Sequence, residues 1–188
     1  VAAEVELEMA RSLAPDNSEL AFLGGQLASF SARFEEAELL FRETLALDPG
    51  HRLGRFALAQ QLERSDEAAG WEEAQQLFAS LLVDLPDNLA VLVEHLRVAA
   101  RREDRAATTA TLERLLALGE GWPPVAVTQL QAVSGAVEAG DFAQAATRAQ
   151  LVRNVLVRLA EFRKDQTAVS VSAELIAGPL RRFLRLPL

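Results

Sequence analysis

Residue types that could do chemistry are sparse in this sequence. It has two histidines, His51 and His95, and no cysteine or tyrosine. The histidines stand 44 positions apart, so they lack the i, i+4 spacing with which a helix binds zinc. His51 follows a Pro-Gly turn and is expected to cap the next element, and His95 is expected to pack between helices. Neither residue is predicted to act as a catalytic base or a metal ligand.

Other candidate groups also have simpler explanations than catalysis. Gly24 and Gly25 fall inside an expected helix and follow no strand, so they do not form a phosphate-binding loop. The pair Glu35 and Glu36 recurs with the repeat described below, which indicates a solvated helix face. No Ser-His-Asp set can be proposed with a reason behind it. We therefore expect no enzymatic activity, no metal and no cofactor.

Composition and charge restrict the classes of function that remain for this chain. The chain has 188 residues, half of them hydrophobic and 24% charged, which is typical of a globular protein. Its net charge is −8, which argues against nucleic-acid binding, yet residues 148–188 carry eight basic and three acidic residues, a net +5. The apolar runs are too short to span a bilayer. Arginine outnumbers the single lysine, Lys164, and alanine is abundant, a composition that suggests a bacterial source.

An internal repeat explains the spacing of the elements. Residues 34–41 and 71–78 share the same order: an aromatic residue, two glutamates, an alanine, then a second aromatic residue. The prolines Pro15, Pro49, Pro86 and Pro123 are spaced 34, 37 and 37 residues apart, and residues 140–145 give a further partial copy. A period near 34 residues corresponds to one helix-turn-helix unit.

Each unit is predicted to contain two helices. In the best copy these are residues 17–31 and 34–47, with N-cap candidates at residues 16–18. Proline lacks an N–H group and disfavours helix in the residue before it, so each proline ends a second helix.

This pattern resembles the tetratricopeptide repeat (TPR) family. The resemblance implies an all-α fold, a right-handed superhelix (an α-α solenoid) of helical hairpins, with a C-terminal capping segment. It assigns small residues to the close approach of the two helices of a unit, here Gly25 and Ala37. It assigns a large residue to the gap against the next unit, here Phe41 and Phe78. The third unit departs from the pattern at Thr108 and Leu112. A helical-hairpin repeat of a neighbouring family is the open alternative.

The domain organisation follows from the repeat. Residues 1–15 are predicted to be the second helix of a truncated repeat with a partly bare apolar face, so we expect a fragment or mature form of a longer protein. Residues 16–164 form four hairpins at 16–49, 50–86, 87–123 and 124–164, and the last helix is expected over residues 142–164. Residues 165–188 are predicted to be a linker and an amphipathic tail.

The resemblance also places a partner-binding groove on the first helices. The positions carried over are Phe22, Gln26, Phe56, Gln60, Val93, Arg97, Leu130 and Ser134. The apolar members suit a partner helix or peptide, and the polar members suit hydrogen bonds to its backbone. The matching positions do not supply the Lys and Asn clamp with which some relatives bind terminal carboxylates. The alternative is that these residues pack between the helices.

The tail carries a second amphipathic pattern. Ile176, Leu180, Phe183 and Leu184 follow at i, i+4, i+7 and i+8, with arginines between them. We expect this tail contact to cap the end of the helical array. A dimer contact, a membrane-surface anchor and a junction to a further domain of an exported protein remain alternatives.

Two functions are compatible with these patterns. The preferred one is a protein-protein interaction module, a TPR scaffold that binds another protein or a peptide in a concave groove. The alternative is a structural spacer or self-association domain of a larger, exported bacterial protein. A homodimer is left open, nucleic-acid and membrane partners are not expected, and the compartment, cytoplasmic or exported, is undetermined.

Overall fold

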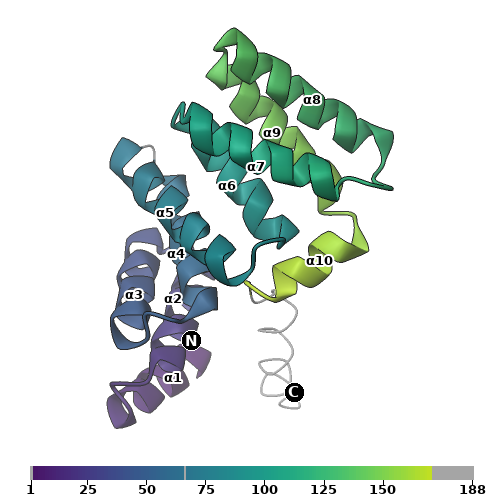
Figure 1. Ribbon diagram of the computed structural model, residues 1–188. Helices are drawn as coiled ribbons and strands as arrows, with labels where there is room; N and C mark the ends of the chain where they lie inside the picture. The colour runs from purple at the N-terminus through teal and green to yellow at the C-terminus, as the bar shows by residue number, and fades with distance from the viewer. Residues whose placement is uncertain (1, 66, 171–188) are drawn as a thin grey trace. The chain divides into compact units, whose positions relative to one another are not determined.

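The computed structural model describes residues 2–65 and 67–170 (Figure 1), and this part of the chain contains ten α-helices and no strand. The all-α prediction is therefore confirmed. The helices are α1 Ala2–Leu13, α2 Ser18–Phe30, α3 Phe34–Leu47, α4 Arg52–Arg64, α5 Ala68–Asp84, α6 Leu89–Arg101, α7 Arg105–Leu118, α8 Pro124–Ala139, α9 Phe142–Leu156 and α10 Ala160–Thr167. No helix in the described ranges has the length and apolarity of a bilayer-spanning segment.

The chain divides into two compact units. The first contains α1, α2, α3 and α4 as far as Gln61, and Val169 and Ser170 group with it. The second contains residues 62–168, with the last turn of α4 and the helices from α5 to α10. Each unit is described separately below.

The hairpin of α2 and α3 in the first unit has the predicted bounds to within one residue. The N-cap residue of α2 is Asn17, whose side-chain oxygen accepts the backbone N–H groups of Glu19 (3.0 Å) and Leu20 (3.2 Å). These donors have no partner within the helix, so the cap fixes where α2 starts. Pro49 lies just after α3, which ends at Leu47 as the proline spacing predicted.

Two glycines allow neighbouring helices of this unit to approach closely. A Cβ atom at Gly25 would lie only 2.5 Å from the ring of Phe41, so α2 and α3 meet at this point because residue 25 has no side chain. A Cβ atom at Gly54 would lie 2.9 Å from Thr44, which brings α4 equally close to α3. Gly25 thus lies where the resemblance expected a small residue, and its neighbour across the hairpin is Phe41, which the resemblance had placed against the next unit.

In the second unit α6 is the central helix. It packs against α5, α7, α9 and α10 (Figure 1). Within α6 every residue from Leu89 to Ala100 except Arg97 is buried. A helix that is apolar on all sides must be covered on all sides, because each exposed aliphatic side chain would lose the free energy of burial.

The helices α6, α7, α8 and α9 form a closed ring. Each packs on the next along the chain, and α9 packs back on α6. The second helix of the last hairpin, α9, packs against α6 because its small and apolar residues cover a side of α6 that would otherwise be bare. These residues are Ala145, Ala149, Val152 and Leu156.

The C-terminal part of the described chain also differs from the prediction. The expected helix over residues 142–164 ends at Leu156, and a separate helix, α10, starts at Ala160, inside and beyond that range. Asp165, predicted to begin a linker, instead covers the start of α6. Its carboxylate accepts the backbone N–H of Leu89 (2.8 Å), and its backbone oxygen accepts the side chain of Asn88 (2.9 Å). A carboxylate at a helix N-terminus satisfies unpaired donors and the helix dipole together.

Candidate functional site

The four apolar residues predicted to line the groove are all in the protein core. Phe22 and Phe56 are each 1% exposed, and Val93 and Leu130 are fully buried. Phe22 lies between the ring of Phe41, with centroids 6.0 Å apart, and the imidazole of His51, 5.0 Å away. These side chains therefore hold helices together and are not presented to a partner.

This burial corrects the expectation of an open apolar row. Val93 is covered because α6 is surrounded by four helices, and Leu130 because α8 lies between α7 and α9. The alternative stated from the sequence, that these residues pack between helices, describes their positions. The sequence could not distinguish the two cases, because an apolar residue at helical spacing is equally suited to either.

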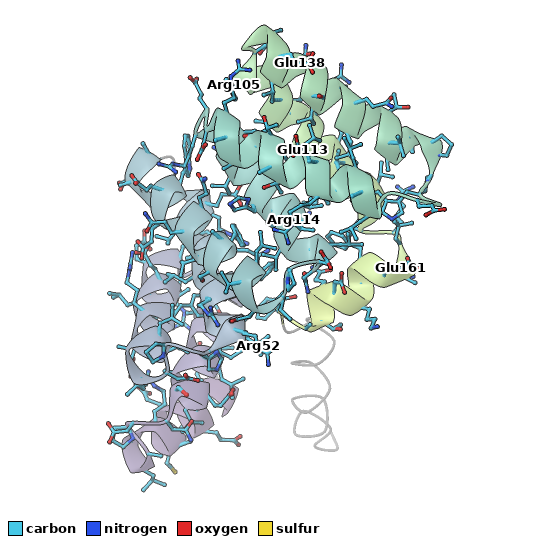
Figure 2. The ribbon with its side chains drawn as sticks, viewed as in Figure 1. Arg52, Arg105, Glu113, Arg114, Glu138 and Glu161 are labelled. Carbon is cyan, nitrogen blue, oxygen red and sulfur yellow. The ribbon has the colours of Figure 1, made fainter. Side chains whose placement is uncertain are left out.

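The four polar residues of the predicted site are all partly exposed. Gln26 lies on α2, Gln60 on α4, Arg97 on α6 and Ser134 on α8. The hydroxyl of Ser134 lies 3.3 Å from the carboxylate of Glu138, which Figure 2 labels on α8. One polar group per first helix is thus accessible from outside, beside an apolar residue that is not.

Arg97 belongs to a network of charged side chains in the second unit. Its guanidinium contacts two carboxylates, Glu63 at the end of α4 and Glu94 one turn earlier on α6 (2.8 Å). Arg153 of α9 donates to the other oxygen of Glu94 (2.6 Å), and Arg101 lies 3.6 Å from Glu63. The side chains of Glu63 and Glu94 are 6% and 3% exposed, so these charges are stable inside the fold only because they are paired.

Burial and neighbouring charges shift the pKa values of Glu63 and Arg97 in this network. Burial raises the pKa of Glu63 above its usual value, Arg97 opposes the rise, and the neighbouring carboxylate of Glu94 adds to it. Burial alone would lower the pKa of Arg97, but Glu94 and Glu63 together raise it, so the guanidinium stays charged. The guanidinium of Arg97 therefore stays charged beside Glu63, a carboxylate whose protonation burial favours.

An aromatic group extends the network toward solvent. The guanidinium of Arg101 lies 4.2 Å from the ring centre of Trp71, within cation–π range. The indole N–H of Trp71 donates to the backbone oxygen of Ser65 (2.9 Å), which fixes the ring at the start of α5. The sequence prediction selected Arg97 but did not join it to Trp71, Glu94 or Arg153. The available signal was charge at positions 94 and 97 within an otherwise apolar helix.

Both histidines have structural partners. His51 precedes α4, and its Nδ1 accepts the backbone N–H of Gly54 (2.9 Å), as expected for a capping residue. His95 is buried, with its Nδ1 2.8 Å from the hydroxyl of Thr111. That hydroxyl donates its only proton to the backbone oxygen of Ala107, so the His95 Nδ1–H must be the donor to Thr111. Burial lowers the pKa of His95 to about 4, and the imidazole is neutral near pH 7.

Two pockets of the second unit lie away from the predicted residues. One of about 250 Å³ lies between α5 and α7 and includes Val83, His95 and Arg114, the last labelled on α7 in Figure 2. The other, of about 420 Å³, includes Trp122 and Lys164. None of the eight predicted site residues lines either pocket. In the described ranges no group of three or more histidine, aspartate or glutamate side chains is arranged to bind a metal ion.

The predicted tail contact, Ile176, Leu180, Phe183 and Leu184, lies outside the described residues. A comparison of the chain with protein-family models gives no match, and a comparison with curated proteins gives no match either.

Proposed function

We propose that this chain is a protein-interaction module of the tetratricopeptide-repeat kind, which holds a segment of another protein and does not transform a substrate. The internal repeat near 34 residues supports this proposal, as does the contact of Gly25 with Phe41 at the positions where such repeats place a small and a large residue. The proposal includes the right-handed superhelix that the resemblance implies.

The observation that carries the proposal is a difference in exposure among the eight residues predicted to line the groove. All four polar members are partly exposed, whereas all four apolar members are buried. A partly exposed amide, guanidinium or hydroxyl therefore stands at the same position of each first helix, where it can reach a partner. We infer that Gln26, Gln60, Arg97 and Ser134 form hydrogen bonds to the partner, and that the apolar neighbours support them from inside.

The partner class follows from these side chains. Amide groups both donate and accept, so Gln26 and Gln60 suit the peptide backbone of an extended or turning segment. The charged network beside Arg97 suits a partner that carries a carboxylate, because the network retains a guanidinium that burial does not neutralise. An amphipathic partner helix inserted between Phe22 and Phe56, the occupant first expected, has no open surface there.

Site-specific photo-crosslinking tests the proposal. A benzophenone amino acid is introduced at Gln26 or Gln60, and at Glu35 or Glu38 of α3 as matched controls in the same unit. The proposal predicts that positions 26 and 60 capture the same protein from cells that produce the chain, and that the control positions do not. Capture of the same proteins at all four positions, or at the controls alone, would refute it.

The burial of Phe22, Phe56, Val93 and Leu130 favours a second candidate, a structural spacer whose helices need no partner. A spacer would tolerate charge changes at its surface. If Gln26→Arg and Gln60→Arg leave the function of the protein unchanged in cells, the spacer is preferred.

A further inference from the structure

One face of α1 is exposed although it is apolar. Val5, Met9 and Leu13 follow at i, i+4 and i+8 and are 56%, 62% and 82% exposed. The helix packs against α2 through its other side, where Leu7 is half-buried. Three aliphatic side chains in a row on one helix face are more than a soluble surface requires, and such patches mark contact sites. We call Val5, Met9 and Leu13 the α1 row.

Carboxylates border the α1 row. With about 100° between successive residues of a helix, Glu6 lies on one side of the row and Glu8 on the other. Both are exposed, and neither has an ion-pair partner within residues 2–65 and 67–170. The face therefore combines an aliphatic centre with negative edges.

The C-terminal segment of the same chain has the complementary chemistry. Its sequence places Ile176, Leu180, Phe183 and Leu184 at helical spacing and adds three positive charges at Arg181, Arg182 and Arg185. The described chain reaches this segment from Val169, which is fully buried and belongs to the same unit as α1.

We propose that residues 176–185 bind the α1 row of their own chain, with the apolar side chains against Val5, Met9 and Leu13 and the arginines beside Glu6 and Glu8. Charge complementarity favours this occupant over a second copy of α1, because two copies facing each other would bring the unpaired glutamates together.

The composition of the chain supplies a clean probe. Met9 is the only methionine and there is no cysteine, so one ¹³C-methyl signal reports the α1 row and one introduced cysteine carries a nitroxide label. The experiment uses the full chain with Ala177→Cys, labelled with nitroxide and with ¹³C-methyl methionine. We expect the Met9 methyl signal to be at least halved by the nitroxide and to recover when the nitroxide is reduced.

Variants of the tail and of the α1 row test whether the loss of the Met9 signal comes from their contact or from a general effect of substitution. In the same labelled chain, Leu180→Glu with Phe183→Glu should restore the Met9 signal. The control Leu39→Glu changes an exposed leucine of α3 in the same unit and should leave the broadening unchanged. Glu6→Arg with Glu8→Arg should weaken the broadening, and adding Arg181→Glu, Arg182→Glu and Arg185→Glu should recover it. Circular dichroism confirms that each variant is folded.

A mixed sample decides whether the tail belongs to the same chain. Nitroxide-labelled chain without ¹³C is mixed with ¹³C-labelled chain without nitroxide, and the proposal predicts no broadening of Met9. Broadening of the Met9 signal in the mixed sample would overturn the proposal and show a second copy as the source of the tail. A Met9 signal unaffected by the nitroxide in either sample would overturn it as well.

Discussion

Gly25 and Phe41 show how a single residue fixes the geometry of a hairpin. The ring of Phe41 occupies the space that a side chain at position 25 would need, so the two residues must change together. Gly135 on α8 provides the contrast, because a Cβ atom there would meet nothing within 4 Å. Glycine is therefore required at position 25 and costs helix stability without a packing benefit at position 135.

We expect Gly25→Ala to lower the free energy of unfolding by roughly 1–2 kcal/mol, since overpacking against Phe41 exceeds the gain in helix propensity. The matched control Gly135→Ala should raise it by roughly 0.5–1 kcal/mol. Denaturant unfolding followed by circular dichroism measures both. Stabilisation by Gly25→Ala would show that α2 and α3 do not approach closely.

His95 makes the stability of the second unit depend on pH. Its pKa is about 4 in the folded protein and near 6.5 when unfolded, so the unfolded chain binds the extra proton between these values. The resulting stability is present above pH 6.5 and is lost as the pH falls toward 4, by about 3 kcal/mol in total. Both tryptophans lie in residues 62–168, so their fluorescence follows this unit.

The variant His95→Gln should remove this part of the pH dependence. Relative to that of the original chain, the variant's free energy of unfolding should increase as the pH falls from 7 to 4, because only the original chain loses the His95 contribution. A constant difference between the two proteins across that range would contradict the buried, neutral state of His95.

At the scale of elements, α6 decides the arrangement of the second unit. Its apolar residues face every direction. Its charged residues Glu94 and Arg97 contact oppositely charged neighbours, Arg153 of α9 for Glu94 and Glu63 for Arg97. The ion pair between Glu94 and Arg153 thus joins helices that lie far apart in the sequence.

Removing Arg153 should weaken that joint. We expect Arg153→Ala to lower the free energy of unfolding by roughly 1–3 kcal/mol, because Glu94 stays buried with only Arg97 to neutralise it. The control Arg42→Ala affects an exposed i, i+4 pair with Glu38 and should change stability by about 0.5 kcal/mol or less. Equal effects of the two substitutions, measured by denaturant unfolding, would contradict the contact of α6 with α9.

The contact of α10 with α6 gives a second prediction at this scale. Asp165→Ala removes the acceptor for the backbone N–H of Leu89 and should cost about 1 kcal/mol, the usual loss for a helix cap. Hydrogen exchange should accelerate first in the opening turn of α6. Unchanged exchange at residues 89–91 would show that α10 does not cap this helix.

The sequence predicted where the helices begin and end better than it predicted which helices pack against one another. Periodicity, caps and prolines predicted α2 and α3 to within one residue, because these signals are local. The end of α9 at Leu156 and the role of Asp165 were missed, since a turn and a cap supplied from 76 residues away leave no local pattern. The placement of α9 against α6 depends on burying every side of α6, which a repeat register does not encode.

At the scale of the whole molecule, the exposure of the candidate site residues was only partly predictable from the sequence. The register selected positions on the first helix of each hairpin, and its polar members are accessible. It also selected Phe22, Phe56, Val93 and Leu130, which are core residues. An aliphatic or aromatic residue can support a site from beneath or form its surface, and only the packing of helices around it decides which.

The central claim is that the polar register residues bind the partner and their apolar neighbours stabilise the fold. Its most direct test is the affinity of the photo-crosslinked partner for two variants, measured by calorimetry beside their unfolding free energies. We predict that Gln26→Arg with Gln60→Arg weakens binding at least tenfold, about 1.4 kcal/mol, without loss of stability, and that Phe22→Leu lowers stability without weakening binding. Unchanged binding in the glutamine variant together with weakened binding in a stably folded Phe22→Leu would contradict the claim.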